Sequence, residues 1–210
     1  EYAKQSGIER IAISTNGSNR PELYDRLIKL GVNYFSISLD ACDEETGDKM
    51  AGNIKGAWRK VIANIQRISK LSYTTVGVVL TPDNISKFHE IVQFASSLGV
   101  SDIRVISASQ WNKPLAELNA IPSEILKKHP ILAYRVRNFM RGKPIRGITA
   151  KDSNTCRLAM DDSVVCGANH YPCVIYMREH GKPIGKISEN MRKERITWLT
   201  FVNTHNDEIC

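Results

Sequence analysis

The cysteines are the residues of this chain whose type and spacing could support metal or redox chemistry. Three of the five, Cys156, Cys166 and Cys173, lie in one short segment, and a fourth, Cys210, is the last residue. No C-x-x-C pair is present, which disfavours a zinc finger or zinc ribbon, whose ligands usually come in close pairs. Four thiolates can also hold an iron–sulfur cluster, for which the loop spacing is freer. The spacing alone leaves open a metal site, unrelated buried cysteines and, less favoured without a secretory signal, two disulfides.

The remaining thiol and the histidines add little to this picture. Cys42 stands apart, and no base near it in the sequence would activate it as a nucleophile, so a structural role is favoured. His170 and His205 lie near the cysteines and are candidate substitute ligands. No H-E-x-x-H motif or other paired spacing of histidines occurs.

A repeating unit precedes the cysteines and must position any site. Short runs rich in β-branched and aromatic residues are followed by a polar turn and then by an amphipathic stretch. Because these runs are nearly continuous in apolar residues, they indicate parallel strands covered on both faces. The pattern predicts an α/β fold, either an open doubly wound sheet or a (β/α) barrel. Strands are expected at 10–14, 33–40, 74–80 and 102–107, and helices at 21–31, 56–71 and 85–99.

Every predicted strand ends in polar residues. In both candidate folds the carboxyl ends of parallel strands meet at one edge, where ligands bind. Four polar ends in register therefore suggest a ligand site, and turn chemistry is the simpler alternative. Asn84 is also placed to cap the helix that follows it. The polar residues are Thr15, Asn16, Ser38, Asp40, Thr81, Asn84, Ser107, Ser109 and Gln110.

The composition restricts the classes of partner. The net charge is +7, from 29 Lys and Arg against 22 Asp and Glu, which suits an anionic small molecule or an acidic peptide. No RNA-binding signature occurs, so nucleic acid is not favoured as a partner. No apolar run is long enough to span a membrane and no signal peptide opens the chain, so we expect a cytoplasmic protein with no membrane partner.

Four segments in order resemble strands three to six of the radical S-adenosylmethionine (SAM) enzymes. They are AISTNGSN (12–19), SISLDA (36–41), GVVLTPDN (77–84) and IRVISASQ (103–110). The tail adds to the resemblance, because Cys156, Gly167, the HYPC that ends at Cys173 and KPIGKISE are similar to the auxiliary-cluster extension called SPASM or twitch.

The resemblance implies a partial parallel (β/α) barrel followed by a small cysteine-containing domain. The expected division is a βα-repeat barrel over 1–110, a helical connector over 111–149 and an auxiliary-cluster-like domain over 150–210. The C-x3-C-x2-C loop of the family, which holds the SAM-binding cluster, is absent from the sequence. We therefore expect a part of the protein upstream of this chain, and the chain alone to be incomplete and inactive.

The resemblance also implies two cofactors, a [4Fe–4S] cluster and SAM. In this family the cluster reduces SAM, and a 5′-deoxyadenosyl radical takes a hydrogen atom from the substrate. The implied partners are an electron donor and a peptide or another small or anionic substrate. The substrate, the product, any catalytic residue and the oligomeric state are not specified by the sequence.

Site residues follow from the same resemblance. Ser38 and Asp40 match positions that touch the ribose or methionine part of SAM, and Asn16 faces the same mouth. Val78 and Ile106 are expected to line the adenine. Among the cysteines, Cys156 and Cys173 are the first expected ligands of an auxiliary cluster, followed by Cys210 and then Cys166.

Two other readings remain open. The chain could be a binding module whose fold is stabilised by zinc or an iron–sulfur cluster, with no radical chemistry of its own. It could also be an ordinary α/β domain in which the cysteines are unrelated and each can be replaced at small cost.

Overall fold

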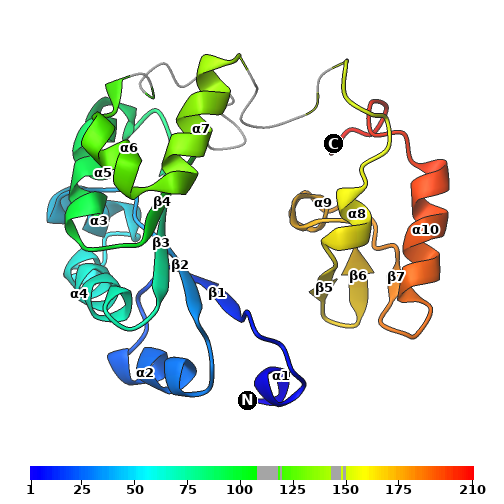
Figure 1. Cartoon of the computed structure of the whole chain (residues 1–210), viewed down its shortest axis with the longest axis horizontal. Helices are drawn as coiled ribbons and strands as arrows, with labels where there is room; N and C mark the ends of the chain where they lie inside the picture. The colour runs from blue at the N-terminus through cyan, green and yellow to red at the C-terminus, as the bar shows by residue number, and fades with distance from the viewer. Residues whose placement is uncertain (108–117, 119, 143–147, 149) are drawn as a thin grey trace. The chain divides into compact units, whose positions relative to one another are not determined.

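A computed structural model describes residues 1–107, 118, 120–142, 148 and 150–210 (Figure 1). The chain divides into two compact units, Glu1–Ile145 and Arg146–Cys210. In the described residues, no helix has both the length and the apolar character needed to cross a membrane. The three-part division expected from the sequence stays a prediction.

A four-stranded parallel sheet, in the order β1-β2-β3-β4, forms the frame of the first unit. All four strands overlap the predicted segments, and the expected parallel α/β architecture is confirmed. The consecutive order follows from βα units whose helices return the chain to the same end of the sheet. The strands are β1 (Ala12–Thr15), β2 (Tyr34–Ser38), β3 (Tyr73–Leu80) and β4 (Asp102–Ser107).

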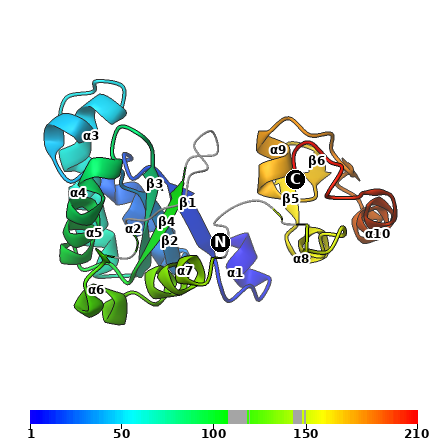
Figure 2. The same ribbon diagram turned by 90° about the horizontal axis from the view of Figure 1, so that it is seen from above.

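Helices α2, α4 and α5 cover one face of this sheet (Figure 2). Each coincides with a predicted helix, although the last of them begins with a 3-10 turn, η1 (Ile85–Lys87). Pro21 starts α2, where its missing N–H costs nothing. The helices of this unit are α1 (Tyr2–Gln5), α2 (Pro21–Lys29), α3 (Glu44–Met50), α4 (Ala57–Ser69), α5 (Phe88–Ser97), α6 (Ser123–Lys128) and α7 (Pro130–Met140).

The two faces of the sheet differ in chemistry because successive side chains of a strand point to opposite sides. The face under α2, α4 and α5 is the hydrophobic core, built around residues such as Phe35, Ile37 and Val76, all fully buried. The opposite face, called the inner face below, carries small polar groups and one cation. Its central residues are Ser14, Ser36, Ser38, Thr75, Gly77 and Arg104.

Asn84 does not cap the helix that follows it, contrary to expectation. Its Oδ1 accepts a hydrogen bond from the Thr81 N–H (2.8 Å). Its Nδ2 donates to the main-chain carbonyls of Asp40 and Val79, each at 3.0 Å. This buried amide therefore fastens the end of β2 to the end of β3, which keeps both strand ends in place.

Close packing of α3 on α4 gives a testable prediction. A Cβ atom at Gly47 would lie 2.2 Å from Cδ1 of Trp58. The Trp58 indole cannot easily move, because it stacks on Phe94 (5.4 Å between ring centroids) and donates to the Ala41 carbonyl (3.1 Å). Gly47→Ala should therefore lower the free energy of unfolding by about 1–3 kcal/mol, as overpacking does.

Chemical denaturation of Gly47→Ala beside Gly77→Ala tests this packing. Gly77 is a matched control, because a Cβ there meets nothing nearer than 3.9 Å. Equal unfolding midpoints for the two variants would show that the indole yields without cost.

The second unit is a small antiparallel sheet with three short helices. Its strands pair in the order β5-β6-β7, and Gly167, with φ of 60°, lies in the tight turn between β5 and β6. The elements are α8 (Leu158–Asp161), β5 (Val164–Cys166), β6 (Asn169–Tyr171), α9 (Val174–Arg178), β7 (Gly185–Lys186) and α10 (Met191–Phe201).

Candidate functional site

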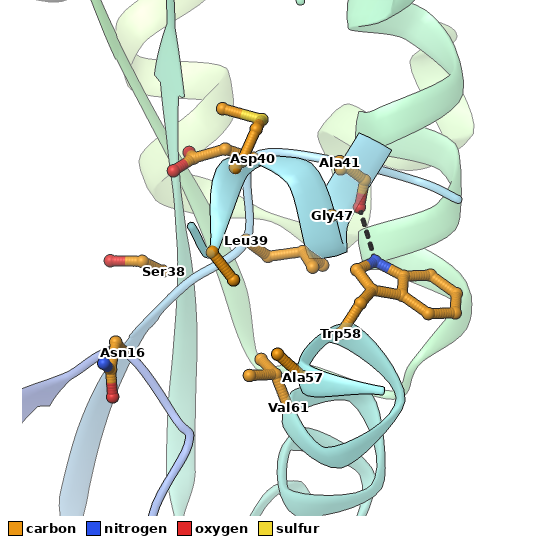
Figure 3. A pocket seen from close by; sticks show the side chains of 11 residues that line it. Asn16, Ser38, Leu39, Asp40, Ala41, Gly47, Ala57, Trp58 and Val61 are labelled. Atoms are coloured by element: carbon orange, nitrogen blue, oxygen red, sulfur yellow. Dashed lines mark hydrogen bonds between the residues drawn. The ribbon is translucent and has the colours of Figure 1, made fainter. Parts of the chain in front are cut away.

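A pocket opens at the carboxyl end of the first two strands (Figure 3). Its volume of about 140 Å³ is below the roughly 300–1,000 Å³ of cavities that enclose whole ligands, so it can hold only a part of a larger molecule. The side chains of Ser38 and Asp40 point to the same side, away from Trp58 (Figure 3). The lining residues are Asn16, Ser38, Leu39, Asp40, Ala41, Gly47, Met50, Ala51, Ala57, Trp58 and Val61.

The Asp40 carboxyl group is held in place by the main chain. Its Oδ1 accepts a hydrogen bond from the Val79 N–H (2.6 Å), and Asn84 binds the Asp40 carbonyl. Burial raises the pKa of this carboxyl, and the Val79 hydrogen bond opposes that rise. In the described part of the chain Oδ2 has no hydrogen-bond partner, so this oxygen can accept a bond from a ligand hydroxyl.

Asn16 combines turn chemistry with an open donor. Its Oδ1 accepts from the N–H of Ser18 (3.1 Å) and from the Ser18 hydroxyl (2.9 Å), which is the local turn that such residues favour. The exposed side chain still lines the pocket. Asn16 therefore shows the turn chemistry expected of a polar strand end, and its place in the lining of the pocket also fits the expected ligand site.

The apolar wall predicted beside the site is shifted by one residue. Val78 is fully buried in the core under the helices, so it has no surface to offer a ligand. Val79 occupies the inner face instead and pairs in register with Ile106, and both are half-buried. The burial of Val78 therefore contradicts the expectation that this residue lines a ligand. Ser109 and Gln110 lie outside the described residues.

The cysteines of the second unit fall into two groups. Cys173 begins α9, and its Sγ accepts a hydrogen bond from the Tyr176 N–H (3.4 Å). Although Cys210 as a whole is exposed, partial burial of its thiol raises the pKa to about 11, with further contributions from Asp207 and then from Cys173 and Cys156. Cys173 and Cys156 are therefore near enough to Cys210 for their charges to act on its thiol. Cys166, at the end of β5, is exposed and has no part in this effect.

The thiols do not form a closed metal site as they stand. All five cysteines are free. Among the described residues, no three His, Cys, Asp or Glu side chains are close enough together to hold a metal ion. Cys42 lies 3.8 Å from a Glu90 carboxylate oxygen, and burial together with that charge raises its pKa, which is the opposite of an activated thiol.

A buried arginine fixes the segment that leads into Cys173. Arg195 is 3% exposed and donates to the carbonyls of Tyr171 (2.7 Å) and Pro172 (3.2 Å). Its Nη2 also donates to the carbonyl of Asp162 (2.9 Å). The Arg195 side chain on α10 therefore holds the main chain immediately before Cys173 in place.

His170 belongs to the same network. Its Nε2 lies 2.8 Å from Oε2 of Glu194, and its Nδ1 lies 3.5 Å from Nη1 of Arg195. Both ring nitrogens are therefore occupied in this structure, and its candidacy as a substitute ligand stays a prediction. His205 is exposed.

Sequence reasoning missed Arg104, the cation of the inner face. A signal was available, because Arg104 lies between the buried Ile103 and Val105, and the period of two places it on the opposite face. Trp58, which lines the pocket, was also missed, because the apolar pattern of its helix does not show that this residue lies beside the strand ends.

The fold and the pocket together define an α/β protein of the (β/α)-barrel class with a polar site at the carboxyl ends of its strands. Residues 1–95 match the family model described as the Radical SAM superfamily. This part of the chain is therefore similar to the radical SAM superfamily, which is the resemblance that the order of the strand motifs predicted. Proteins of this superfamily use a [4Fe–4S] cluster and SAM.

Curated relatives match about half of the chain. An AdoMet-dependent heme synthase of Methanosarcina barkeri is 27% identical over 100 residues, which are 47% of this chain and 28% of that protein. A probable GTP 3′,8-cyclase of Sulfurisphaera tokodaii is 30% identical over 105 residues, 49% of this chain and 33% of that protein. The matched segment thus spans a third or less of these relatives.

Solved structures share the fold over most of the chain. SuiB of Streptococcus suis superimposes with a TM-score of 0.54 at 12% identity, covering 94% of this chain and 50% of that one. The structure titled native anSMEcpe with bound AdoMet gives a TM-score of 0.54 at 15% identity, covering 88% of this chain and 55% of that one. A further structure of anSMEcpe, with AdoMet and the Kp18Cys peptide, gives 0.53 at 14% identity, covering 92% and 57%.

Proposed function

We propose that this chain is the SAM-binding and auxiliary-cluster part of a radical SAM enzyme. The observation that carries the proposal is the pocket in which Asn16, Ser38 and Asp40 gather at the carboxyl ends of the strands of a radical SAM domain. The structural relatives with bound AdoMet support it. The free thiols favour a reducing compartment, and we place the protein in the cytoplasm.

Each pocket residue has a role toward SAM that its chemistry allows. Oδ2 of Asp40 would accept a hydrogen bond from a ribose hydroxyl, and the exposed Ser38 hydroxyl can donate or accept one beside it. The amide of Asn16 can donate to the methionine part. Val79 and Ile106 would form an apolar wall for the adenine.

The cluster that reduces SAM needs ligands that these residues do not supply. The sequence contains no C-x3-C-x2-C motif, so no step of radical formation is assigned to this chain. What the chain contributes is the recognition and orientation of the cofactor.

Replacement of Asp40 tests the SAM site. Asp40→Asn keeps an oxygen that can accept the Val79 N–H, whereas Asp40→Ala leaves that N–H without a partner. We expect SAM affinity to fall about tenfold in both variants, because a hydrogen bond to a charged acceptor contributes about 1.5–3 kcal/mol. Equilibrium dialysis with labelled SAM measures this affinity.

A matched control separates binding from folding. Asp83 is exposed on the turn that follows β3 and lines no part of the pocket, so Asp83→Ala should bind SAM as the wild type does. SAM affinity that is equal in the wild type, Asp40→Asn and Asp40→Ala would refute the assignment of Asp40.

For the second unit we propose an auxiliary iron–sulfur site that includes Cys156, Cys173 and Cys210. The nearness of Cys156 and Cys173 to the Cys210 thiol and the soft thiolate donor set support this site. Their separation in the structure means that loading must draw them closer together. Cys166 remains a weaker candidate, because it does not contribute to the raised pKa of Cys210.

Iron, sulfide and zinc content after anaerobic reconstitution tests this proposal. Cys173→Ser should lose most of the bound iron, whereas Cys42→Ser, which changes a thiol in the other unit, should keep it. Tight zinc with neither iron nor SAM binding would instead support a metal-stapled binding module. No bound metal in the wild type would contradict both assignments.

The substrate belongs to the proposal only as a class. The relatives include a structure with a bound peptide, a heme synthase and a GTP cyclase. The net charge of +7 adds a preference for an anion. We therefore propose a peptide or a small anionic substrate, with a separate electron donor.

A further inference from the structure

One basic side chain stands in the middle of the inner face of the sheet. Arg104 belongs to the edge strand β4, yet its Nη2 lies 3.4 Å from the Ser36 hydroxyl oxygen on β2. The side chain therefore crosses over the intervening strand β3. It can do so because the residue in register with it on β3 is Gly77, which leaves open space above the sheet.

The guanidinium is exposed and carries no countercharge. In the described part of the chain, no carboxylate lies within ion-pair distance of Arg104. Asp102, on the same side of β4, accepts hydrogen bonds from main-chain N–H groups, chiefly those of Ile103 and Ile131, and from the Tyr73 hydroxyl, and forms no ion pair with Arg104. An unpaired arginine beside hydroxyl groups has the donors that a carboxylate or phosphate needs.

The position of this group separates it from the proposed SAM residues. Ser36, which Arg104 contacts, lies two residues before Ser38 on the same strand and face. At about 3.3 Å per residue, the guanidinium contact is roughly 7 Å further from the carboxyl ends of the strands. A ligand that contacts both the pocket and Arg104 would place its anionic group on the inner face, further from the carboxyl ends of the strands than the pocket is.

From this geometry we propose that Arg104 binds the carboxylate or phosphate group of the substrate on the inner face of the sheet. The inference rests on the proposed function, because it takes the ligand to be the substrate of a radical SAM enzyme. Ser36 orients the guanidinium, and Gly77 provides the passage that lets it reach the centre of the sheet. The substrate class is thereby narrowed to molecules with an oxyanion.

Inorganic pyrophosphate and SAM serve as probes in one titration experiment, followed by NMR shifts of labelled protein. Pyrophosphate should bind the wild type, shift the Arg104 Nε–H signal and bind Arg104→Gln about tenfold or more weakly. Arg104→Lys should recover part of the affinity, because it keeps the charge without the planar fork. Arg59→Gln is the control, since Arg59 on α4 is a surface arginine that is paired with Glu44 on α3.

Four results of these titrations bear on the inference, and the two that concern SAM binding by Arg104→Gln distinguish the sources of the anion. SAM binding that is unchanged in Arg104→Gln supports a substrate anion, whereas an equal loss of SAM binding assigns Arg104 to the SAM carboxylate and overturns the inference. Pyrophosphate binding that is equal in the wild type and Arg104→Gln also overturns it. Wild-type protein that binds pyrophosphate through Arg104 but never binds SAM would contradict the proposed function and leave the anion site standing.

Discussion

Replacing Arg195 with methionine should unfold the cysteine-containing unit. The change removes donors from three main-chain carbonyls, those of Tyr171, Pro172 and Asp162, inside a unit of 146–210 that has a small core. A buried acceptor that loses its partner costs about 1–3 kcal/mol, and three of them exceed what a small unit can lose. We expect a loss of at least about 3 kcal/mol and rapid proteolysis of the second unit.

A matched variant on the same helix isolates the effect of burial. Arg192 is exposed on α10, so Arg192→Met removes the same charge without removing a buried donor. Limited proteolysis and denaturation of the two variants should differ sharply. Protection of the second unit in Arg195→Met at the wild-type level would show that the three carbonyls find other donors. In that case Arg195 would not determine the position of Cys173.

The second large effect is expected at Asp102, the first residue of β4. Its carboxylate is 1% exposed and accepts from the N–H groups of Ile103 (2.8 Å) and Ile131 (2.9 Å). The second of these fixes the N-terminus of α7, where a negative charge is also favoured by the helix dipole. Asp102→Ala should therefore cost about 3 kcal/mol and release α7 from the sheet.

Hydrogen exchange of the α7 amides, together with denaturation, measures this loss. Asp102→Asn keeps one acceptor and should cost less than Asp102→Ala. The exposed Asp83 provides the reference, since Asp83→Ala should leave the stability within about 0.5 kcal/mol of the wild type. Slow exchange throughout α7 in Asp102→Ala would mean that packing alone holds this helix.

The strands and helices of the first unit could be predicted because their signals are local. Runs rich in β-branched and aromatic residues mark β2 and β3, and the stripe formed by Ile65, Ile68 and their neighbours marks α4. The side of the sheet on which each residue falls is less secure, because a shift of one residue exchanges the two faces. Val78 and Val79 illustrate this, since only the register with β4 shows which of them faces the helices.

The candidate site could be predicted only in part. The polar strand ends identified Asn16, Ser38 and Asp40, because parallel strands bring their carboxyl ends to one edge. The side chain of Arg104 reaches the centre of the inner face across the strand that carries Gly77, which is far away in the sequence and leaves open space there. No local pattern reveals such a relation, and the same holds for the hydrogen bonds that Arg195 makes around Cys173.

The central claim is that SAM binds at the carboxyl ends of the strands, and residue-resolved NMR titration of this chain with SAM tests it most directly. The account predicts that the largest amide shifts occur at Asn16, Ser38, Asp40 and Val79, and that Asp40→Ala removes them while Arg59→Gln does not. Shifts confined to other surfaces, such as the pocket that Trp198 and Phe201 of α10 line, or no shifts at millimolar SAM, would contradict the claim.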